Sequence, residues 1–434
     1  MQSRSMQCRL IRSRPLSQVC LRRFLLWLFG VTWFAAYQSI SIGADPQPNE
    51  LSSSRRTEQP VSQSFQSEPL IITDLSVGQD PSNRLPLDAR EVACLAACRW
   101  HPAVGLRQRV HTIRQLFCND SHGSRQASTA IVNFLQLQAA HQEDIGAASA
   151  MRAYYSRIGI TEQQQWIHAG GKAVELQQQK QQSLLEHGFA TALDLSSLQR
   201  KNLDLQDQWL QTSSQLRQLQ KLLTGLTGQD FECAQHMVEP LVVQSSILDC
   251  EKLIAQAFRN RSDLLAWQQL CCHIDEHNAP MVATILSSIS GNFGLPMPTA
   301  SLLKRLTCQG LDPSVLADSL KRELSVLIQT HQAYIEQSVQ EKCEQLQLAY
   351  QRHEIELHRI DNWVARIEKI DRLESHGQTR PDQKMIAEAG LLESHSTEVT
   401  RRLDAKLAEI ALAEAVGGLA IRSCQGLAWL PTGY

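Results

Sequence analysis

The stretch LLEHGFATALDLSSLQRKNLDLQDQWLQTSSQLRQLQKLLTGL (184–226) carries the pattern that decides the fold. Alternating steps of four and three residues from Leu184 reach Leu at most positions, and Gly, Thr, Asn or Trp at the others. A seam with this 3.5-residue period is typical of helices that pack along one another as coiled coils. If residues 162–226 form one helix, it is about 98 Å long, and we expect it to pack along other long helices.

Gly188 occupies the second position of this seam. A missing side chain there lets two backbones approach closely or lets the helix bend. Upstream, apolar residues recur three or four apart over 127–158, which predicts another amphipathic helix. We expect Gly159 to end that helix, and Thr161 with Gln164 to form a capping box for the next one.

A second seam of the same period runs from Val339 to Ile367, and a His-Gly pair follows it at 376–377. An equivalent His-Gly pair occurs in the first region at 187–188. Each pair is followed by Thr, by Asp and by a helix-forming stretch that ends in Gly. We interpret these regions as two internal repeats. The predicted seam residues are Gly188, Leu195, Leu198, Leu205, Trp209, Leu216, Leu219 and Leu223 in the first, and Val339, Leu346, Leu357, Ile360 and Ile367 in the second.

The predicted fold class is all-α, with long antiparallel coiled-coil hairpins in two tandem repeats and little or no β structure. Aromatic residues make up only 6% of the chain, which argues against a β-rich core. The predicted segments are a signal peptide (1–44), a disordered linker (45–85), repeat 1 (86–228), a connecting segment (229–268), repeat 2 (269–418) and a C-terminal tail (419–434).

The N-terminal segment has the order of a secretory signal. Six arginines precede any acidic residue, an apolar run covers 24–37, and small residues stand before Asp45. The run is short for a membrane-spanning helix, and an uncleaved signal anchor is the alternative. The linker is rich in Ser, Gln, Pro and Arg, a composition typical of disorder. A net charge of −2 gives no electrostatic reason to expect nucleic-acid binding.

The cysteines outside the signal are scattered, so their connectivity does not follow from the sequence. An exported chain is able to form disulfides. The favoured interpretation treats the cysteines as small hydrophobic residues in helices. Cys94 and Cys98, one helical turn apart with His101 nearby, are accordingly predicted to be two small buried residues rather than metal ligands.

The segment CCHIDEH (271–277) contains His273, Glu276 and His277 in the H-x-x-E-H order that inverted zinc peptidases use on a helix. A third ligand in a supporting context is not evident downstream, and Asn278-Ala279-Pro280 is a helix stop. The favoured interpretation is a polar helix end, with zinc binding as the alternative. Because hydrolase, P-loop and dinucleotide motifs are also missing, we predict no catalytic residue and no cofactor.

The chain resembles the TolC family of outer-membrane efflux proteins over about residues 88–418. AACRWHPAV (96–104) is similar to the Ala-rich start of the family, with His101 in place of Asn. Repeat 1 follows the family order of Gly, Thr-x-x-Asp and a long helix closing on Leu-Leu-x-Gly. A box similar to Ala-x-x-x-Arg-x-Asp-Leu follows it. The matching residues are Gly188, Thr191, Asp194, Leu222, Leu223 and Gly225 in repeat 1, Ala257, Arg261, Asp263 and Leu264 in the box, and Gly377 in repeat 2.

The resemblance implies a homotrimer whose helices form a tube across the periplasm. Such a tube exports small molecules or polypeptides across the outer membrane together with an inner-membrane pump and a periplasmic adaptor protein. It also implies that the chain is exported to the outer membrane or periplasm of a Gram-negative-type cell, and that it conducts rather than catalyses.

The chain departs from the family at the β-hairpins that members place between paired long helices. Residues 158–163 leave no room for one, and 279–298 hold at most one or two short strands because their alternation is poor. The alternative is therefore a periplasmic coiled-coil scaffold or interaction protein, derived from the same family, that lacks the membrane barrel.

Overall fold

The computed structural model describes residues 87–117, 122–187, 195–231, 240–243, 248–283, 312–376 and 381–425. The chain divides into Met1–Val77 and Gly78–Tyr434, and all described residues lie in the second unit. Within these ranges nearly every residue is helical and no β-strand occurs, so the predicted all-α class is confirmed. The predicted signal peptide and linker lie outside the described residues.

The first half contains two short helices, one very long helix and one of intermediate length. They are α2 (Ala89–Arg99), α3 (His101–Phe117), α4 (His122–Glu186) and α5 (Leu195–Thr227). The 65 residues of α4 correspond to a length of about 98 Å. Asp88 starts α2 with a capping box, because its side chain accepts from the Glu91 N–H and the Glu91 side chain accepts from the Asp88 N–H.

The second half repeats this order. Its helices are α6 (Cys250–Asn260), α7 (Ser262–His273), α10 (Pro313–Ser375) and α11 (Pro381–Val416), followed by the short α12 (Leu419–Cys424). Asp249 caps α6, as Asp88 caps α2, and both of these helices are 11 residues long.

The expected helix boundary at 159–163 is wrong, because α4 runs through it without interruption. Gly159 lies against α11, where a Cβ would come 2.9 Å from Leu403 Cδ2, so glycine here allows a close helix contact. The Thr161 hydroxyl donates to the Arg157 carbonyl in the preceding turn, at 2.8 Å, instead of capping a new helix.

A single helix over 162–226 is also wrong, because α4 ends at Glu186 and α5 begins at Leu195. The two helices pack antiparallel. The Gln164 amide donates to the Ser213 hydroxyl at 2.9 Å, and Leu205 lies beside Gly170. The seam keeps its period on both sides of residues 187–194, so periodicity alone does not locate the break. Gly188, Thr191 and Asp194 lie outside the described residues.

In the second hairpin, Gly377 followed by Pro381 predicts a local break in the helix, and the structure has the break between residues 375 and 381. α10 ends at Ser375 and α11 begins with Pro381, whose fixed φ suits the first helical turn. The two helices are antiparallel, since Tyr350 pairs with Glu409 and Trp363 packs on Gly390. Gly377 lies outside the described residues.

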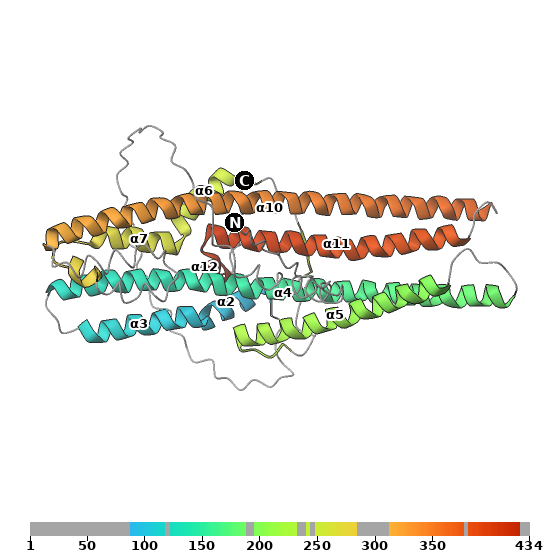
Figure 1. Ribbon diagram of the computed structural model, residues 1–434, viewed down its shortest axis with the longest axis horizontal. Coiled ribbons are helices and arrows are strands. Elements are labelled where there is room, and N and C mark those ends of the chain that lie inside the picture. The colour runs from blue at the N-terminus through green and yellow to red at the C-terminus, as the bar shows by residue number, and fades with distance from the viewer. Residues whose placement is uncertain are drawn as a thin grey trace, which may run out of the picture. The chain divides into compact units, whose positions relative to one another are not determined.

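The four longer helices of this unit lie side by side in the order α10, α11, α4, α5 (Figure 1). α4 and α11 are antiparallel too, because Arg152 pairs with Glu414 and the ring of Trp166 stacks on that of His395. The short helices pack on the remaining halves of α4 and α10. α2 and α3 pack on α4, α6 packs on α10, and α7 packs on both α4 and α10.

Three apolar clusters hold these layers together. One joins α3, α4, α7 and α10, with Phe134 against Trp267 at 4.6 Å between ring centroids. A second joins α2, α4, α5, α11 and α12, and a third joins α6, α7, α10 and α11. In the second cluster many buried side chains are alanines, and helices with small side chains at their contact pack closely.

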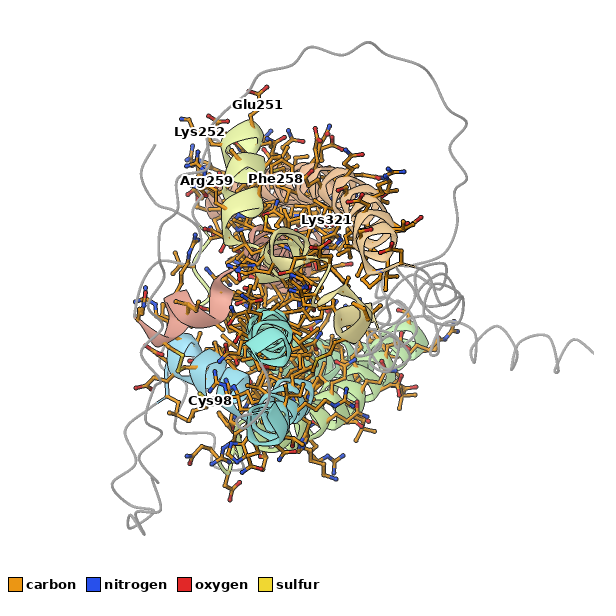
Figure 2. The ribbon with its side chains drawn as sticks, turned by 90° about the vertical axis from the view of Figure 1, so that its left-hand side faces the viewer. Cys98, Glu251, Lys252, Phe258, Arg259 and Lys321 are labelled. Atoms are coloured by element: carbon orange, nitrogen blue, oxygen red, sulfur yellow. A yellow bond between two sulfur atoms is a disulfide. The ribbon has the colours of Figure 1, made fainter. Side chains whose placement is uncertain are left out.

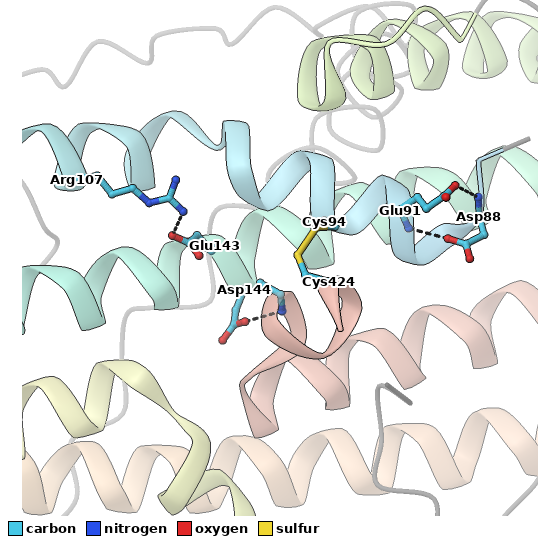
Figure 3. The surroundings of a disulfide bond; sticks show 8 residues. Asp88, Glu91, Cys94, Arg107, Glu143, Asp144 and Cys424 are labelled. Carbon is cyan, nitrogen blue, oxygen red and sulfur yellow. Dashed lines mark hydrogen bonds and ion pairs between the residues drawn. A yellow bond between two sulfur atoms is a disulfide. The ribbon is translucent and has the colours of Figure 1, made fainter. Parts of the chain in front are cut away.

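The disulfide between Cys94 and Cys424 corrects the interpretation of Cys94 and Cys98 as two buried small residues. Cys94 on α2 is bonded to Cys424 on α12, with 5.1 Å between their Cα atoms, and Cys98 is exposed (Figure 3). Gly417 and Gly418, with φ of 83° and 76°, turn the chain after α11 and direct α12 towards α2. The two cysteines are 330 residues apart in sequence, so no local pattern announces the bond.

Candidate assembly surface and buried polar junction

The layer of four helices has an edge helix on each side. α5 packs on α4 and α2, and α10 packs on α11, α6 and α7. Along the described residues α5 and α10 do not pack against each other, and Figure 1 shows them on opposite sides of the layer. The layer is therefore open rather than closed within one chain.

Each edge helix exposes a pair of large apolar side chains. Leu203 and Leu210 on α5 are 63% and 67% exposed, and Leu348 and Ile355 on α10 are 45% and 53% exposed. Residues seven apart lie on the same side of a helix, so each pair forms a stripe. We call these the outer stripes. Exposed apolar side chains on the open side of an edge helix are candidates for burial in an assembly contact.

The two outer stripes overlap in height at one end of each. Leu205 on α5 lies beside Gly170 on α4. From α4 the ring of Trp166 stacks on His395 of α11, and Gly390 of α11 lies against Trp363 of α10. Because each step joins antiparallel neighbours, α5 and α10 run in opposite directions, and Leu210 comes level with the turn of α10 that carries Ile355.

Polar side chains tie the inner helices together. Arg402 on α11 donates to Glu162 on α4 at 2.9 Å and to the Leu241 carbonyl at 3.2 Å. His353 on α10 lies 3.0 Å, Nε2 to Oε1, from Glu398 on α11. These half-buried bonds fix the register of α4, α11 and α10 along the layer, which apolar contacts alone specify less sharply.

A buried ion pair lies at the junction of α6 and α7. Arg261 donates from Nε to Asp263 Oδ1 at 2.9 Å and from a terminal nitrogen to Oδ2 at 2.5 Å, and it also donates to the Ala415 carbonyl at 3.3 Å. His331 of α10 lies 2.9 Å from Asp263 Oδ2. Burial acts to raise the pKa of Asp263, but the bonds from Arg261 and His331 outweigh it and hold that pKa well below its ordinary range. The structure thus brings together two motif residues named from the sequence.

A second buried carboxylate, Asp144 on α4, was not singled out from the sequence. It accepts hydrogen bonds from the backbone N–H groups of Gly418 and Ala420 at 2.9 and 2.8 Å, at the start of α12 (Figure 3). Burial raises its pKa to about 6, although these bonds act in the other direction. Its neighbours His141, Gln142 and Glu143 are polar as well, so the sequence offers no distinct signal for this carboxylate.

The predicted residues of the first seam are mostly covered. Leu198 and Leu223 are buried, and Trp209 is 42% exposed beside the His168 ring. The remaining described members are half-buried: Leu195, Leu205, Leu216 and Leu219. α5 therefore turns this side towards α4.

The second seam is covered over only part of its length. Val339 and Leu346 are fully buried, and Ile360 and Ile367 are half-buried, but Leu357 is 43% exposed. Beyond residue 350 the covered side of α10 instead includes Glu356, Trp363 and Ile370. Each of these precedes the expected seam position by one residue, since the steps become three and four rather than four and three. Glu356 is paired there with Arg359.

The metal-site candidates are not assembled into a helical motif. α7 ends at His273, so Glu276 and His277 lie in the turn that follows it rather than one helical turn further along. The Asn278 side chain donates to the His273 carbonyl at 2.7 Å and closes the helix end. All three candidates are exposed, and the described ranges contain no group of three or more side chains placed to hold a metal ion.

No protein-family model matches the sequence, and no curated protein matches it significantly. Solved structures do match the fold. A structure of CusC, described as showing folding and transmembrane channel formation, has a TM-score of 0.57 at 11% identity, over 85% of this chain and 99% of CusC. The outer membrane protein VceC from Vibrio cholerae has a TM-score of 0.52 at 13% identity, over 76% and 95% of the two chains.

The open state of the Neisseria gonorrhoeae MtrE outer membrane channel also matches, with a TM-score of 0.52 at 9% identity over 76% of this chain and 89% of MtrE. The fold is therefore that of TolC-like outer-membrane channels, as the sequence predicted. None of the helices in the parts of the chain described here is both long and apolar enough to cross a membrane.

Proposed function

We propose that the chain is one subunit of a TolC-like helical conduit for efflux, assembled as a homotrimer. The observation that carries the proposal is the pair of outer stripes, which overlap in height on two edge helices that run in opposite directions. If α5 of one copy packs on α10 of the next, every neighbouring pair of helices in the assembly stays antiparallel.

This contact joins two different surfaces, so it is heterologous, and such contacts generate closed rings when the rotation closes. The number three comes from the resemblance to TolC. In a closed ring the outer stripes lose their exposure to water. Fully burying a leucine or isoleucine contributes about 1.5–3 kcal/mol, and each junction would bury such side chains where the two stripes overlap, at Leu210 and Ile355. Leu357 and Trp209, which are partly exposed in the single chain, would also gain cover.

The ring has a transport role in this proposal, with no chemical step. Its helices enclose a path across the periplasm, and the export substrate, an inner-membrane pump and a periplasmic adaptor complete the system by resemblance. The location that follows is the outer membrane or periplasm. The fold similarity to CusC and MtrE, whose descriptions name a channel, and to the outer membrane protein VceC supports this role.

The test is a single charge placed on an outer stripe. Leu210→Glu should convert the trimer to monomers, because an unpaired carboxylate cannot be buried cheaply in an apolar contact. The measurement is mass in detergent, by light scattering, on protein extracted from the outer-membrane fraction. The matched control is Leu176→Glu on α4, an inner helix of the layer, where the leucine is 57% exposed.

A wild-type monomer, or equal loss of assembly in both variants, would contradict the proposal. A stable trimer found in the soluble periplasmic fraction, without conductance in a planar bilayer, would favour the scaffold alternative instead.

A further inference from the structure

Two thiols meet in the second half of the chain. Cys250 is the first residue of α6, and Cys343 lies in the middle of α10. Cys250 packs against the buried cluster that contains Cys343, Val339 and Leu346. Burial, with a smaller contribution from the neighbouring Cys250 side chain, raises the pKa of the Cys343 thiol above its ordinary value. Both are free thiols in this structure.

The chain carries a disulfide elsewhere, between Cys94 and Cys424. Disulfides form and persist in oxidising compartments and are rare where glutathione keeps thiols reduced. A chain that holds one disulfide is exposed to an oxidant that acts on other accessible thiol pairs as well. The thiols of Cys250 and Cys343 are therefore under conditions that favour their oxidation to a disulfide.

The equivalent position in the first half also links the start of a short helix to a long helix. An interval of 189 residues relates equivalent positions in the two halves. It separates His187 after α4 from His376 after α10, and Gly228 after α5 from Gly417 after α11. The same interval relates Tyr154 to Cys343. Tyr154 donates its hydroxyl to the Leu87 carbonyl at 3.1 Å, and so ties the start of α2 to α4.

We propose that Cys250 and Cys343 form a second disulfide in the exported protein, which ties the start of α6 to α10 as Tyr154 ties the start of α2 to α4. The oxidant is a protein disulfide of a thiol oxidoreductase. The Cys250 thiolate attacks one sulfur of that disulfide and releases the other as a thiolate, which leaves a mixed disulfide. The Cys343 thiolate then attacks the Cys250 sulfur and releases the second thiolate of the oxidant.

The balance of this exchange is one disulfide formed, one disulfide reduced to two thiols, and no net change in protons once the released thiolates are protonated. Burial sets the order of the two attacks. Cys343 is fully buried, whereas Cys250 is half-buried at the end of a helix whose next residues, Glu251 and Lys252, reach the outer surface (Figure 2). Cys250 therefore meets the oxidant first, and Cys343 resolves the mixed disulfide from inside.

The first test is a disulfide map of the full-length protein purified from the exporting compartment. Free thiols are alkylated during lysis, and the chain is digested without reductant and analysed by mass spectrometry. The expected major species is a peptide with Cys250 linked to a peptide with Cys343. Alkylated Cys250 and Cys343 in most molecules, or a link from either to another cysteine, would overturn the proposal.

The second test separates the bond from a packing effect. In a Cys94→Ser, Cys424→Ser background, a reductant should lower the midpoint of urea unfolding, and the further change Cys250→Ser should remove this response to reductant. Cys272→Ser, at an exposed position on α7, is the matched control and should leave the response unchanged. A background protein whose midpoint does not respond to reductant would show that the bond is not formed.

Discussion

The junction between α2 and α3 and the junction between α6 and α7 occupy equivalent places in the two halves but hold different side chains. Each follows an 11-residue helix and has one extended residue, Trp100 with ψ of 111° and Arg261 with ψ of 106°. Trp100 packs against α4, where a Cβ on Gly146 would come 2.9 Å from its Cβ and Cγ atoms. Arg261 instead forms a buried ion pair with Asp263.

The difference shows that the backbone conformation of the junction does not depend on which side chains pack in it. What the halves share is the length of the first helix and the left-handed glycine after the fourth helix, Gly228 in the first and Gly417 in the second. The Trp100 ring packed on Gly146 and the Arg261–Asp263 ion pair with His331 are two different ways to pack an equivalent helix junction. The following predictions test how far the two junctions differ in energy.

The largest effect is expected from Asp263→Ala. Removing one partner of a buried pair leaves the other charge unpaired, which costs about 3–5 kcal/mol. The measurement is the free energy of unfolding by urea, followed by circular dichroism. Arg261→Met with Asp263→Leu should cost much less, because both charges leave together. A single variant as stable as the double one would show that Arg261 is not left as an uncompensated buried charge.

The next effect concerns the tie between α2 and α12. Cys94→Ser with Cys424→Ser should lower the free energy of unfolding by about 2–5 kcal/mol, the usual range for removal of a native disulfide. The unfolding midpoint in urea measures this loss. Cys98→Ser, one turn along the same helix and exposed, serves as the control and should change little. Equal midpoints for wild type and double variant would mean that α12 is held by its apolar contacts alone.

The pH dependence should have opposite sign at the two buried carboxylates. Burial raises the pKa of Asp144 to about 6, above the value of about 4 of an unfolded chain. The folded chain therefore binds this proton more tightly, so the contribution of Asp144 is greatest below pH 4 and is lost as pH rises through 6. At Asp263 the pKa is lowered, so its contribution is full above pH 4 and declines as pH falls below that value.

These trends are measured as differences in unfolding free energy between wild type and Asp144→Asn, and between wild type and Asp263→Asn, from pH 3 to pH 8. One pKa unit corresponds to about 1.4 kcal/mol, so the Asp144 difference should fall by about 1–3 kcal/mol between pH 4 and 7. A rise over that interval would mean that the bonds from Gly418 and Ala420 dominate over burial.

The smallest effect compares the two left-handed glycines. Alanine in this conformation costs about 1–2 kcal/mol at either site. At Gly417 a Cβ would also come 3.2 Å from the Arg261 Cα, a backbone atom, whereas at Gly228 it would meet the end of the flexible Arg99 side chain. Gly417→Ala should therefore be the more destabilising of the two in urea unfolding. The reverse order would place the tighter junction in the first half.

The sequence predicted what depends on period and on strong helix breakers. The 3.5-residue seam indicated long paired helices, and Gly377 with Pro381 indicated the break between α10 and α11. It did not locate the end of α4, since the seam keeps its phase past Glu186. Gly159 looked like a stop because its partner, Leu403, is 244 residues away in sequence.

Other long-range pairings could not be predicted from the sequence either, because the partners are far apart along the chain. Arg261 and Asp263 were named through a motif two residues apart, but their contact with His331 depends on how α7 packs on α10. Neither the bond from Cys94 to Cys424 nor the cap that Asp144 provides for α12 has a local signature. The shift of the covered side of α10 to Glu356, Trp363 and Ile370 likewise depends on the position of α11 rather than on the residues of α10.

The bond between Cys94 and Cys424 makes the intervening 330-residue interval a closed covalent ring. Both helical hairpins belong to that ring, so tension applied at the two ends of the chain passes through the sulfurs and bypasses the hairpins. A protease that cuts once anywhere between the two cysteines leaves a molecule of unchanged mass, apart from one added water. Such a nick becomes visible as two fragments only after reduction.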